Sequence, residues 1–272
     1  MTKVLVILTC FNRREKTTKC INSLVNGNRK LEFSFVVVDD NSNDGTVEAL
    51  NELRPNITIL SGDGNLYWAG GMRKGIEYCH NNKYESDYVL FVNDDVDFYE
   101  GSIDKLINQE NNLGSVVVGA TSDEYGKLTY GALKLNEGKV KGQYYPVQPA
   151  FKGNCDTFNM NCVLMPKRIF DRMGNFDKVY QHALADLDYG LKISRSGYYI
   201  EVSEDFVGIC HTNSIKGTWK DTSLKRLDRL KKKESIKGPP FKPWFYYLNK
   251  NFGLIFAIKY SLSPYIRILM GK

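Results

Sequence analysis

The sequence has few of the residues that build metal clusters or disulfide frameworks. Its 272 residues include three histidines and six cysteines, and no two cysteines form a CxxC pair. It also has no run of about 18 uncharged apolar residues, so we expect no segment that spans a bilayer. Met1–Lys3 leads directly into an apolar stretch that is too short for a secretory signal. We therefore expect a cytoplasmic protein with reduced, buried thiols.

Acidic residues are scarce at one end of the chain. From Lys216 to Lys272 there are 14 Lys and Arg residues against three Asp and Glu, a net charge of +11, whereas the remainder carries −5. Such asymmetry indicates an anionic partner. The basic residues of this stretch lie beside Trp, Tyr and Phe, which is typical of an interfacial helix on anionic lipid.

The apolar segment Phe252–Ile258 ends at Lys259, so we expect it to lie on a membrane without crossing it. Nucleic acid is a weaker alternative, because no nucleic-acid-binding fold accompanies the charge. Two further alternatives remain: the extension packs against the rest of the chain, or it forms a homodimer contact.

Two short apolar runs each end in a cluster of carboxylates. Phe35–Val38 is followed by Asp39 and Asp40, and Tyr88–Val92 is followed by Asn93-Asp94-Asp95. Continuous apolar runs of this length are typical of strands buried on both faces of a parallel sheet. Ligands of open α/β sheets bind beyond the carboxyl ends of the strands. We therefore interpret the first cluster as a nucleoside contact and the second as a metal site.

Apolar runs alternate with helical patterns along the first half of the chain, which predicts βαβ units and a mostly parallel sheet. We expect strands at Val4–Leu8, Phe33–Val38, Ile57–Leu60, Tyr88–Val92, Val116–Ala120, Asp156–Met165 and Tyr198–Val202, and helices ending near Asn26, Leu53, Asn81, Met173 and Ser196. The predicted organisation is one α/β domain over 1–215, with halves 1–113 and 114–215, and a basic helical extension over 216–272.

Five segments resemble, in order, the motifs of family-two glycosyltransferases with the GT-A fold. Leu5–Arg13 resembles the opening strand and TYNR turn, Val38–Thr46 the VDDGSTDGT segment, Val92–Asp95 the DXD motif, Gly174–Asp177 the GGFDE turn and Ala185–Lys192 the EDVDLGLR helix. The match runs from Met1 to about Asn213. Gly64–Met72 is most similar to the bacterial rhamnosyltransferase-like branch of O-antigen and capsule enzymes. The resemblance implies a Rossmann-like, mixed sheet flanked by helices.

The resemblance implies roles for four carboxylates. Asp40 would contact the nucleotide base, where it accepts the N3–H of uracil or thymine. Asp95 would bind Mn²⁺ or Mg²⁺ on the donor diphosphate, while Asp94 would face the ribose. Asp186 would be the general base of an inverting transfer. Each has a structural alternative, since Asp residues also cap turns and helix N-termini.

Further residues match the family at the nucleotide-sugar site. The resemblance places Thr9, Phe11, Asn12 and Arg13 there from the first turn. Trp68, Gly71 and Arg73, in the loop into the third helix, are further candidates, because glycines let the backbone approach a ligand and a helix N-terminus favours phosphate; the family often carries Asn near Arg73. It implies that His211 reaches the metal or the diphosphate. His182, which precedes the Asp186 helix, is a candidate for the acceptor site. Asn93 and Ala185 depart from the family pattern.

The implied activity is transfer of a sugar from a UDP- or dTDP-sugar to a glycan acceptor. The acceptor is expected to be lipid-linked, at the cytoplasmic face of a bacterial inner membrane. A sugar-1-phosphate nucleotidyltransferase is an alternative, but Thr9-Cys10-Phe11-Asn12 lacks the Gly- and Arg-rich phosphate loop that it needs. A non-catalytic nucleotide-sugar-binding scaffold is another, favoured by Asn93 and Ala185.

Overall fold

The computed structural model describes residues 1–53, 56–110, 114–136 and 143–272. The strands are β1 (Thr2–Cys10), β2 (Leu31–Asp39), β3 (Asn56–Ser61), β4 (Tyr88–Val92), β5 (Asp97–Phe98), β6 (Val116–Ser122), β7 (Leu128–Tyr130), β8 (Ala132–Leu135), β9 (Tyr144–Pro146), β10 (Thr157–Phe158), β11 (Cys162–Pro166) and β12 (Ile200–Ile209). The helices are α1 (Arg14–Gly27), α2 (Thr46–Asn51), α3 (Tyr67–Asn82), α4 (Ser102–Gln109), α5 (Lys167–Met173), α6 (Ala185–Arg195), α7 (Arg226–Lys233), α8 (Phe241–Phe252), α9 (Leu254–Ser261) and α10 (Ser263–Leu269).

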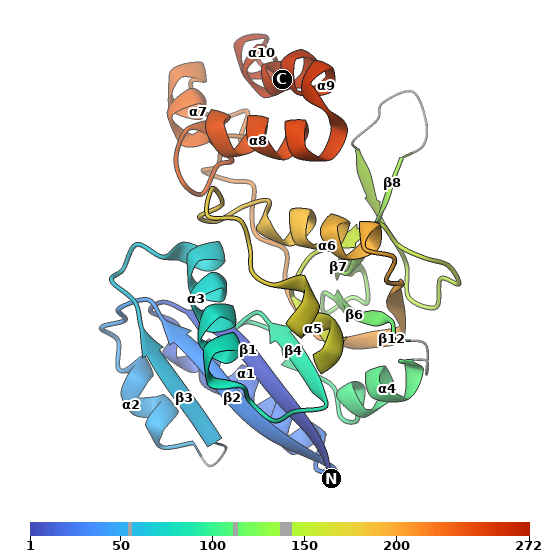
Figure 1. Ribbon diagram of the computed structural model, residues 1–272. Helices are drawn as coiled ribbons and strands as arrows, with labels where there is room; N and C mark the ends of the chain where they lie inside the picture. Colours follow the sequence, from blue (N-terminus) through green and yellow to red (C-terminus); the bar gives the residue numbers. More distant parts are fainter. Residues whose placement is uncertain (54–55, 111–113, 137–142) are drawn as a thin grey trace.

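A mixed sheet crosses the lower part of the molecule (Figure 1). Within the described residues it has nine strands in the order β3–β2–β1–β4–β11–β6–β12–β5, with β7 paired to β6. The first four are parallel to one another, and β11 runs antiparallel to both of its neighbours. The carboxyl ends of β1, β2 and β4 therefore meet at one edge, where ligands of such sheets bind.

Alternating side chains of β1 supply two apolar cores. Val4, Val6 and Leu8 face one side with helices α1, α2 and α4, while Leu5 and Ile7 face the other side with α3, α5 and α6. All five side chains are buried. A strand covered by helices on both faces is apolar throughout, which explains why its sequence lacks an alternating polar pattern.

The two predicted halves of the α/β domain share this sheet. Strand β11 of the second half pairs with β4 of the first, and β5 of the first half pairs with β12 of the second. Residues 111–113, at the predicted boundary, lie outside the described residues. The sequence pattern did not indicate β5 or α4. One strand was expected over Asp156–Met165, where the structure has β10 and β11 separated by 159–161.

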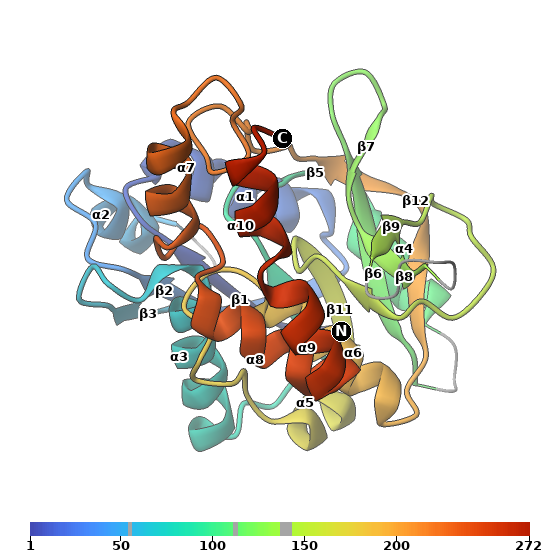
Figure 2. The same cartoon turned by 90° about the horizontal axis from the view of Figure 1, so that it is seen from above.

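The C-terminal extension is helical from Arg226 onward, whereas 216–225 forms turns instead of the predicted helix. Seen from above, α7–α10 lie together on the side of the molecule that carries α6 (Figure 2). Tyr247 and Leu248 of α8 are buried in the same core as Tyr189 of α6. In the described part of the chain, no helix combines the length and the apolar character needed to cross a bilayer.

Candidate active site

A cavity of about 690 Å³ opens at the edge where β1, β2 and β4 end. Its far wall comes from residues 159–161 and from the start of α6. Eight residues predicted for the site line it: Thr9, Phe11, Arg13, Asp40, Trp68, Asp94, Asp95 and Asp186. The fold thus brings residues from both halves of the sequence to one space.

The two carboxylates after β4, Asp94 and Asp95, both form ion pairs with the Arg13 side chain. Arg13 Nη1 lies 2.8 Å from Asp94 Oδ1 and 3.0 Å from Asp95 Oδ2. Burial raises the pKa of Asp94 to about 6; Arg13 opposes this shift and Asp95 adds to it. Two carboxylates this close need a shared positive charge, because their mutual repulsion otherwise disfavours ionisation of both.

Asn93, at the first position of the DXD-like motif, anchors an aromatic wall of the cavity. Its side-chain oxygen accepts a hydrogen bond of 2.8 Å from Trp68 Nε1. The Trp68 ring in turn stacks on Phe176, with 5.9 Å between the ring centroids. Asn93 therefore orients Trp68, and its side-chain oxygen is already engaged.

Asp40 organises the loop that leads into α3. Its Oδ1 accepts hydrogen bonds from the backbone N–H groups of Gly64 (2.9 Å) and Leu66 (3.2 Å), and its Oδ2 accepts one from Tyr67 (3.0 Å). The side chain is buried at the cavity edge. These bonds match the structural alternative of a turn and helix cap, because they satisfy N–H groups just before α3 and at its first residue.

Asp186 lies in the first turn of α6 and is half-buried against the cavity. Burial raises its pKa to about 6, although backbone N–H groups of Leu187 and Met160 and the side chain of Asn159 lower it in part. Leu184, just before the helix, has φ of 77°, which is a strained conformation for a leucine. A carboxylate with a raised pKa in a cleft is suited to accept a proton near neutral pH.

Four residues predicted for the site do not line this cavity. Asn12 links two loops, since its Oδ1 accepts from Asn43 N and its backbone N–H donates to Ser42. A side chain at Gly71 would overlap Thr9, so glycine permits close packing of α3 on β1. The remaining two are Arg73 and His211.

Arg73 and His211 make contacts away from the cavity. The guanidinium of Arg73 donates to the backbone oxygen of Tyr180 at 2.9 Å. His211 is largely exposed, and its Nδ1 lies 3.0 Å from Glu124 Oε2. It lines a neighbouring depression of about 320 Å³, which it shares with Arg13 and Asp95.

Several lining residues were missed or only partly recognised from sequence. Asn159 and Asn161 were placed inside one continuous predicted strand, whereas they lie in the connection between β10 and β11. Lys237 looked like one of many basic residues of the extension. His182, a weaker candidate, does line the cavity, and burial together with Lys237 lowers its pKa. His182 is therefore neutral at physiological pH.

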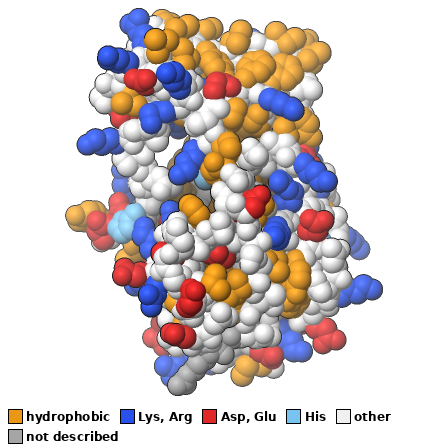
Figure 3. Space-filling view, turned by 90° about the vertical axis from the view of Figure 1, so that its left-hand side faces the viewer, with side chains coloured by type: hydrophobic (Ala, Val, Ile, Leu, Met, Phe, Trp, Pro, Cys, Tyr) orange, Lys and Arg blue, Asp and Glu red, His pale blue; other side chains and the backbone are white. Residues whose placement is uncertain are grey.

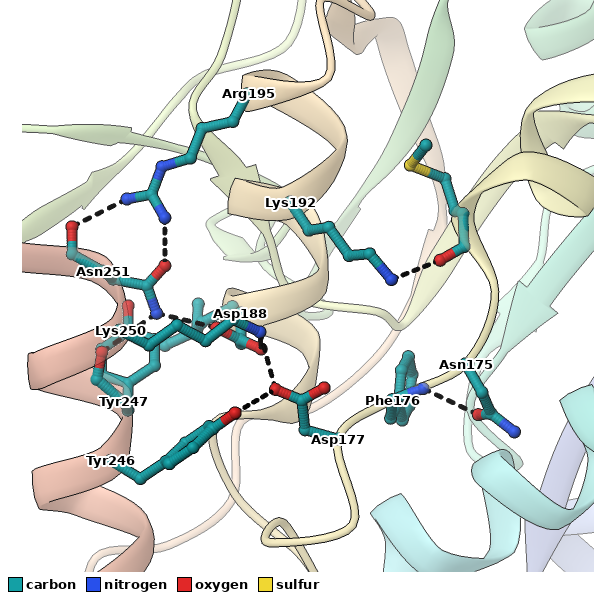
Figure 4. Close-up of polar contacts among 12 residues, drawn as sticks. Asn175, Phe176, Asp177, Asp188, Lys192, Arg195, Tyr246, Tyr247, Lys250 and Asn251 are labelled. Carbon is teal, nitrogen blue, oxygen red and sulfur yellow. Dashed lines mark hydrogen bonds and ion pairs between the residues drawn. The ribbon is translucent and has the colours of Figure 1, made fainter.

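Polar contacts tie α6 to the extension (Figure 4). Lys250 Nζ donates to Asp188 Oδ2 at 2.6 Å and to Asp177 Oδ2 at 2.7 Å. Asn251 Nδ2 donates to Asp188 Oδ1 at 2.7 Å, and Arg195 donates twice to Asn251. Burial disfavours the charge of Asp177, yet Lys250 and Tyr246 hold its pKa below the ordinary value. Helix α8 thus fixes the helix that carries Asp186.

The residues after β4 can hold a divalent cation. Mg²⁺ and Mn²⁺ take oxygen ligands, often one or two carboxylates completed by substrate phosphates and water. Asp94 and Asp95 present one oxygen each to a single atom of Arg13, so both already face a common cation position. Among the described residues, no three His, Cys, Asp or Glu side chains form a complete ligand set. The donor set therefore fits a metal that is shared with a diphosphate.

Comparison with protein families agrees with this geometry. Residues 5–174 match the model of glycosyl transferase family 2, which covers more than half of the chain. The chain belongs to glycosyl transferase family 2. This membership confirms the family predicted from the five motifs.

A curated relative extends the comparison. The chain is 23% identical over 190 residues to the N-acetylglucosaminyl-diphospho-decaprenol L-rhamnosyltransferase of Mycobacterium tuberculosis (strain ATCC 25618 / H37Rv). The aligned region spans 61% of this chain and 62% of the length of that relative, which is less than two thirds.

Solved structures of glycosyltransferases share the fold. S. aureus TarS 1-349 in complex with UDP-GlcNAc superposes with a TM-score of 0.60 at 15% identity, covering 98% of this chain and 90% of that one. Mannosyltransferase PcManGT from Pyrobaculum calidifontis, in complex with GDP-Man and Mn²⁺, superposes with a TM-score of 0.57 at 14% identity. This match covers 98% of this chain and 73% of that one. The predicted GT-A architecture is confirmed.

Proposed function

We propose that this family-2 member is an inverting glycosyltransferase that uses a UDP- or dTDP-sugar. The observation that carries the proposal is one cavity with carboxylates of two kinds. Asp94 and Asp95 follow β4 and share the guanidinium of Arg13 as their counter-ion. Asp186 comes from the start of α6, and burial raises its pKa to about 6. A sugar diphosphate and an acceptor hydroxyl need these two environments side by side.

In the proposed reaction, an acceptor hydroxyl attacks the anomeric carbon of the donor sugar. Asp186 takes the hydroxyl proton as the new carbon–oxygen bond forms, and the bond to the diphosphate breaks on the opposite face, so the configuration inverts. A divalent cation held by Asp95 and Asp94 would stabilise the negative charge of the departing diphosphate. Arg13 and Lys237 add positive charge to the same cavity.

We propose a lipid-linked glycan as the acceptor, which places the reaction in bacterial surface polysaccharide synthesis such as that of O-antigen or capsule. The support is the name of the rhamnosyltransferase relative, which states a diphospho-decaprenol acceptor. Such an acceptor carries its own diphosphate beside a sugar hydroxyl. Lys237 and the neutral His182 line the cavity near Asp186 and can contact this part of the ligand.

Binding of the donor is tested by thermal unfolding with UDP, dTDP, GDP and CMP, each with and without Mn²⁺. A nucleotide at 100 times its dissociation constant adds about 2.7 kcal/mol to the free energy of unfolding. We expect a stabilisation by UDP or dTDP that depends on Mn²⁺. Asp95→Asn should remove the Mn²⁺-dependent part, whereas Asp186→Asn should retain it. If no nucleotide shifts the transition, the assignment of the cavity as a donor site is wrong.

A further inference from the structure

The last two helices of the extension present apolar side chains outward. Ile255, Ile258, Leu262, Ile266 and Leu269 are each between 52% and 85% exposed. Ile255 and Ile258 share one face of α9, Ile266 and Leu269 share one face of α10, and Leu262 lies at the junction between the two helices. We call these five residues the outer stripe.

The opposite side of the same helices packs inward. Ala257, Ser261 and Ile268 are buried, and Phe256 and Tyr260 are partly covered. Both sides of α9 are thus apolar, although a surface helix of a soluble domain normally turns a polar face to water. Figure 3 shows hydrophobic side chains gathered over the upper end of the molecule, where these helices lie.

The structure narrows the membrane contact expected from the sequence to the apolar end of the extension, which begins in the predicted segment Phe252–Ile258. Arg229 and Lys233 of α7 are buried, whereas Lys231 and Lys232 of the same helix stay exposed. Lys233 is buried, with its ammonium group near the rings of Trp219 and Tyr265 and hydrogen-bonded to the backbone oxygen of Pro239. Tyr247 is also buried. Most of the large apolar side chains that the extension exposes lie on α9 and α10 or directly beside them, and α7 and α8 add Leu227, Phe241 and Tyr246.

Positive charge accompanies the outer stripe. The 38 residues from Ser235 to Lys272 contain no Asp or Glu and six Lys or Arg. Lys259 and Arg267 lie on α9 and α10 themselves, and both are exposed. A symmetric dimer would bring two such surfaces together and make like charges repel. Anionic lipid instead complements the cations and accepts the apolar side chains.

We propose that the outer stripe inserts into the interfacial layer of an anionic bilayer, with α9 and α10 lying along its surface. This proposal rests on the proposed function only for its purpose, which is to bring a lipid-linked acceptor to the cavity. Helix α8 joins the stripe to α6 through Lys250 and Asn251. Lys237, just before α8, lines the cavity itself. Membrane contact and active site therefore belong to one connected structure.

Co-sedimentation of the full chain with vesicles tests the proposal. We expect binding to vesicles of phosphatidylcholine and phosphatidylglycerol, and much weaker binding to phosphatidylcholine alone or at high salt. The double variant Ile255→Glu/Ile258→Glu should lower the partition coefficient about 100-fold, because each buried isoleucine contributes about a factor of ten. Leu227→Glu is the matched control, since Leu227 is 72% exposed on α7 outside the stripe, and it should bind nearly as the wild type does.

Three results would overturn the proposal: no binding of the wild type to anionic vesicles, equal binding of the stripe variant, or equal loss in the Leu227→Glu control. Light scattering after gel filtration supplies a further check. A dimer that the stripe variant dissociates would assign the surface to a second copy. Nucleotide-dependent thermal shifts of the stripe variant should equal those of the wild type. Loss of nucleotide binding with intact vesicle binding would contradict the proposed function and leave this inference standing.

Discussion

At the scale of single residues, burial decides the chemistry of the cavity. Asp94 and Asp186 are the described aspartates whose pKa burial raises to about 6, and both line the cavity. Asp94 has Arg13 as a counter-ion, whereas Asp186 receives hydrogen bonds and no ion pair among the described residues. The surroundings of Asp94 thus suit it to binding a cation, and those of Asp186 suit it to accepting a proton.

Replacement of Asp186 by Asn should abolish turnover and stabilise the protein. The folded-state pKa is about 6 against an ordinary value of 3.8, so the unfolded chain ionises first and stability falls as pH rises between these values. Near pH 7.5 the variant should gain about 1–2 kcal/mol in free energy of unfolding, and near pH 4 about nothing. Urea unfolding at both pH values measures this. An unchanged stability difference across the range would contradict the raised pKa.

The pH dependence of turnover should also report the raised pKa of Asp186. A general base must be ionised, so kcat/KM should fall as pH drops through about 6 and stay level above it. Release of nucleoside diphosphate from the donor, with a short-chain polyprenyl-diphosphate glycan as acceptor, gives the profile. Asp94 titrates in the same range and adds to the acid limb. A profile that is level from pH 5 to pH 8 would exclude Asp186 as the base.

At the scale of elements, α6 depends on α8 for its position. Asp188 is almost fully buried, and its charge is met by Lys250 and Asn251, both from α8. Asp188 lies two residues after Asp186, on another side of α6. The helix therefore points one carboxylate into the cavity and fixes itself with the other.

Lys250→Met should destabilise the protein by about 2–4 kcal/mol, because it leaves the buried Asp188 carboxylate without its cation. Lys105→Met is the matched control, since Lys105 and Asp205 form an ion pair with both side chains about two-thirds exposed. That control should cost less than about 1 kcal/mol. Urea unfolding of both, and of Lys250→Met/Asp188→Asn, completes the test. The double variant should recover part of the loss, and equal effects of the two single substitutions would refute the anchoring role.

At the scale of the whole molecule, one apolar core joins the catalytic domain to the extension. Tyr247, Leu248 and Ala257 of the extension lie in the same core as Tyr189 of α6 and Ile7 of β1. The central sheet also includes strands from both halves of the catalytic domain. Elements that share one core lose their packing together, which favours a single unfolding transition.

We expect the extension and the catalytic domain to unfold together. Trp68→Phe leaves Trp219 and Trp244, both in the extension, as the fluorescent reporters. Their transition in urea should coincide with that of far-UV circular dichroism, which reports on all helices and strands. A fluorescence transition at clearly lower urea would show that the extension is a separate folding unit.

The sequence by itself determined the order of elements and the family. Apolar runs such as Tyr88–Val92 are local signals, and β4 has these bounds in the structure. The motifs likewise located Asp94, Asp95 and Asp186, because side-chain chemistry at a fixed distance from a strand or helix is a local property. The two-residue strand β5 was missed, and β10 was merged with β11, since tertiary pairing and not local propensity forms such short strands.

Only the tertiary structure decided which residues meet. It turned Asp40 toward three N–H groups of one loop, His211 toward Glu124 and Lys237 into the cavity. It also buried Lys233 and left Ile255 exposed, although lysine is normally an exposed residue type and isoleucine a buried one. The physical reason is that burial and pairing depend on contacts between distant segments. Residue type sets what a side chain can do, and packing determines what it faces.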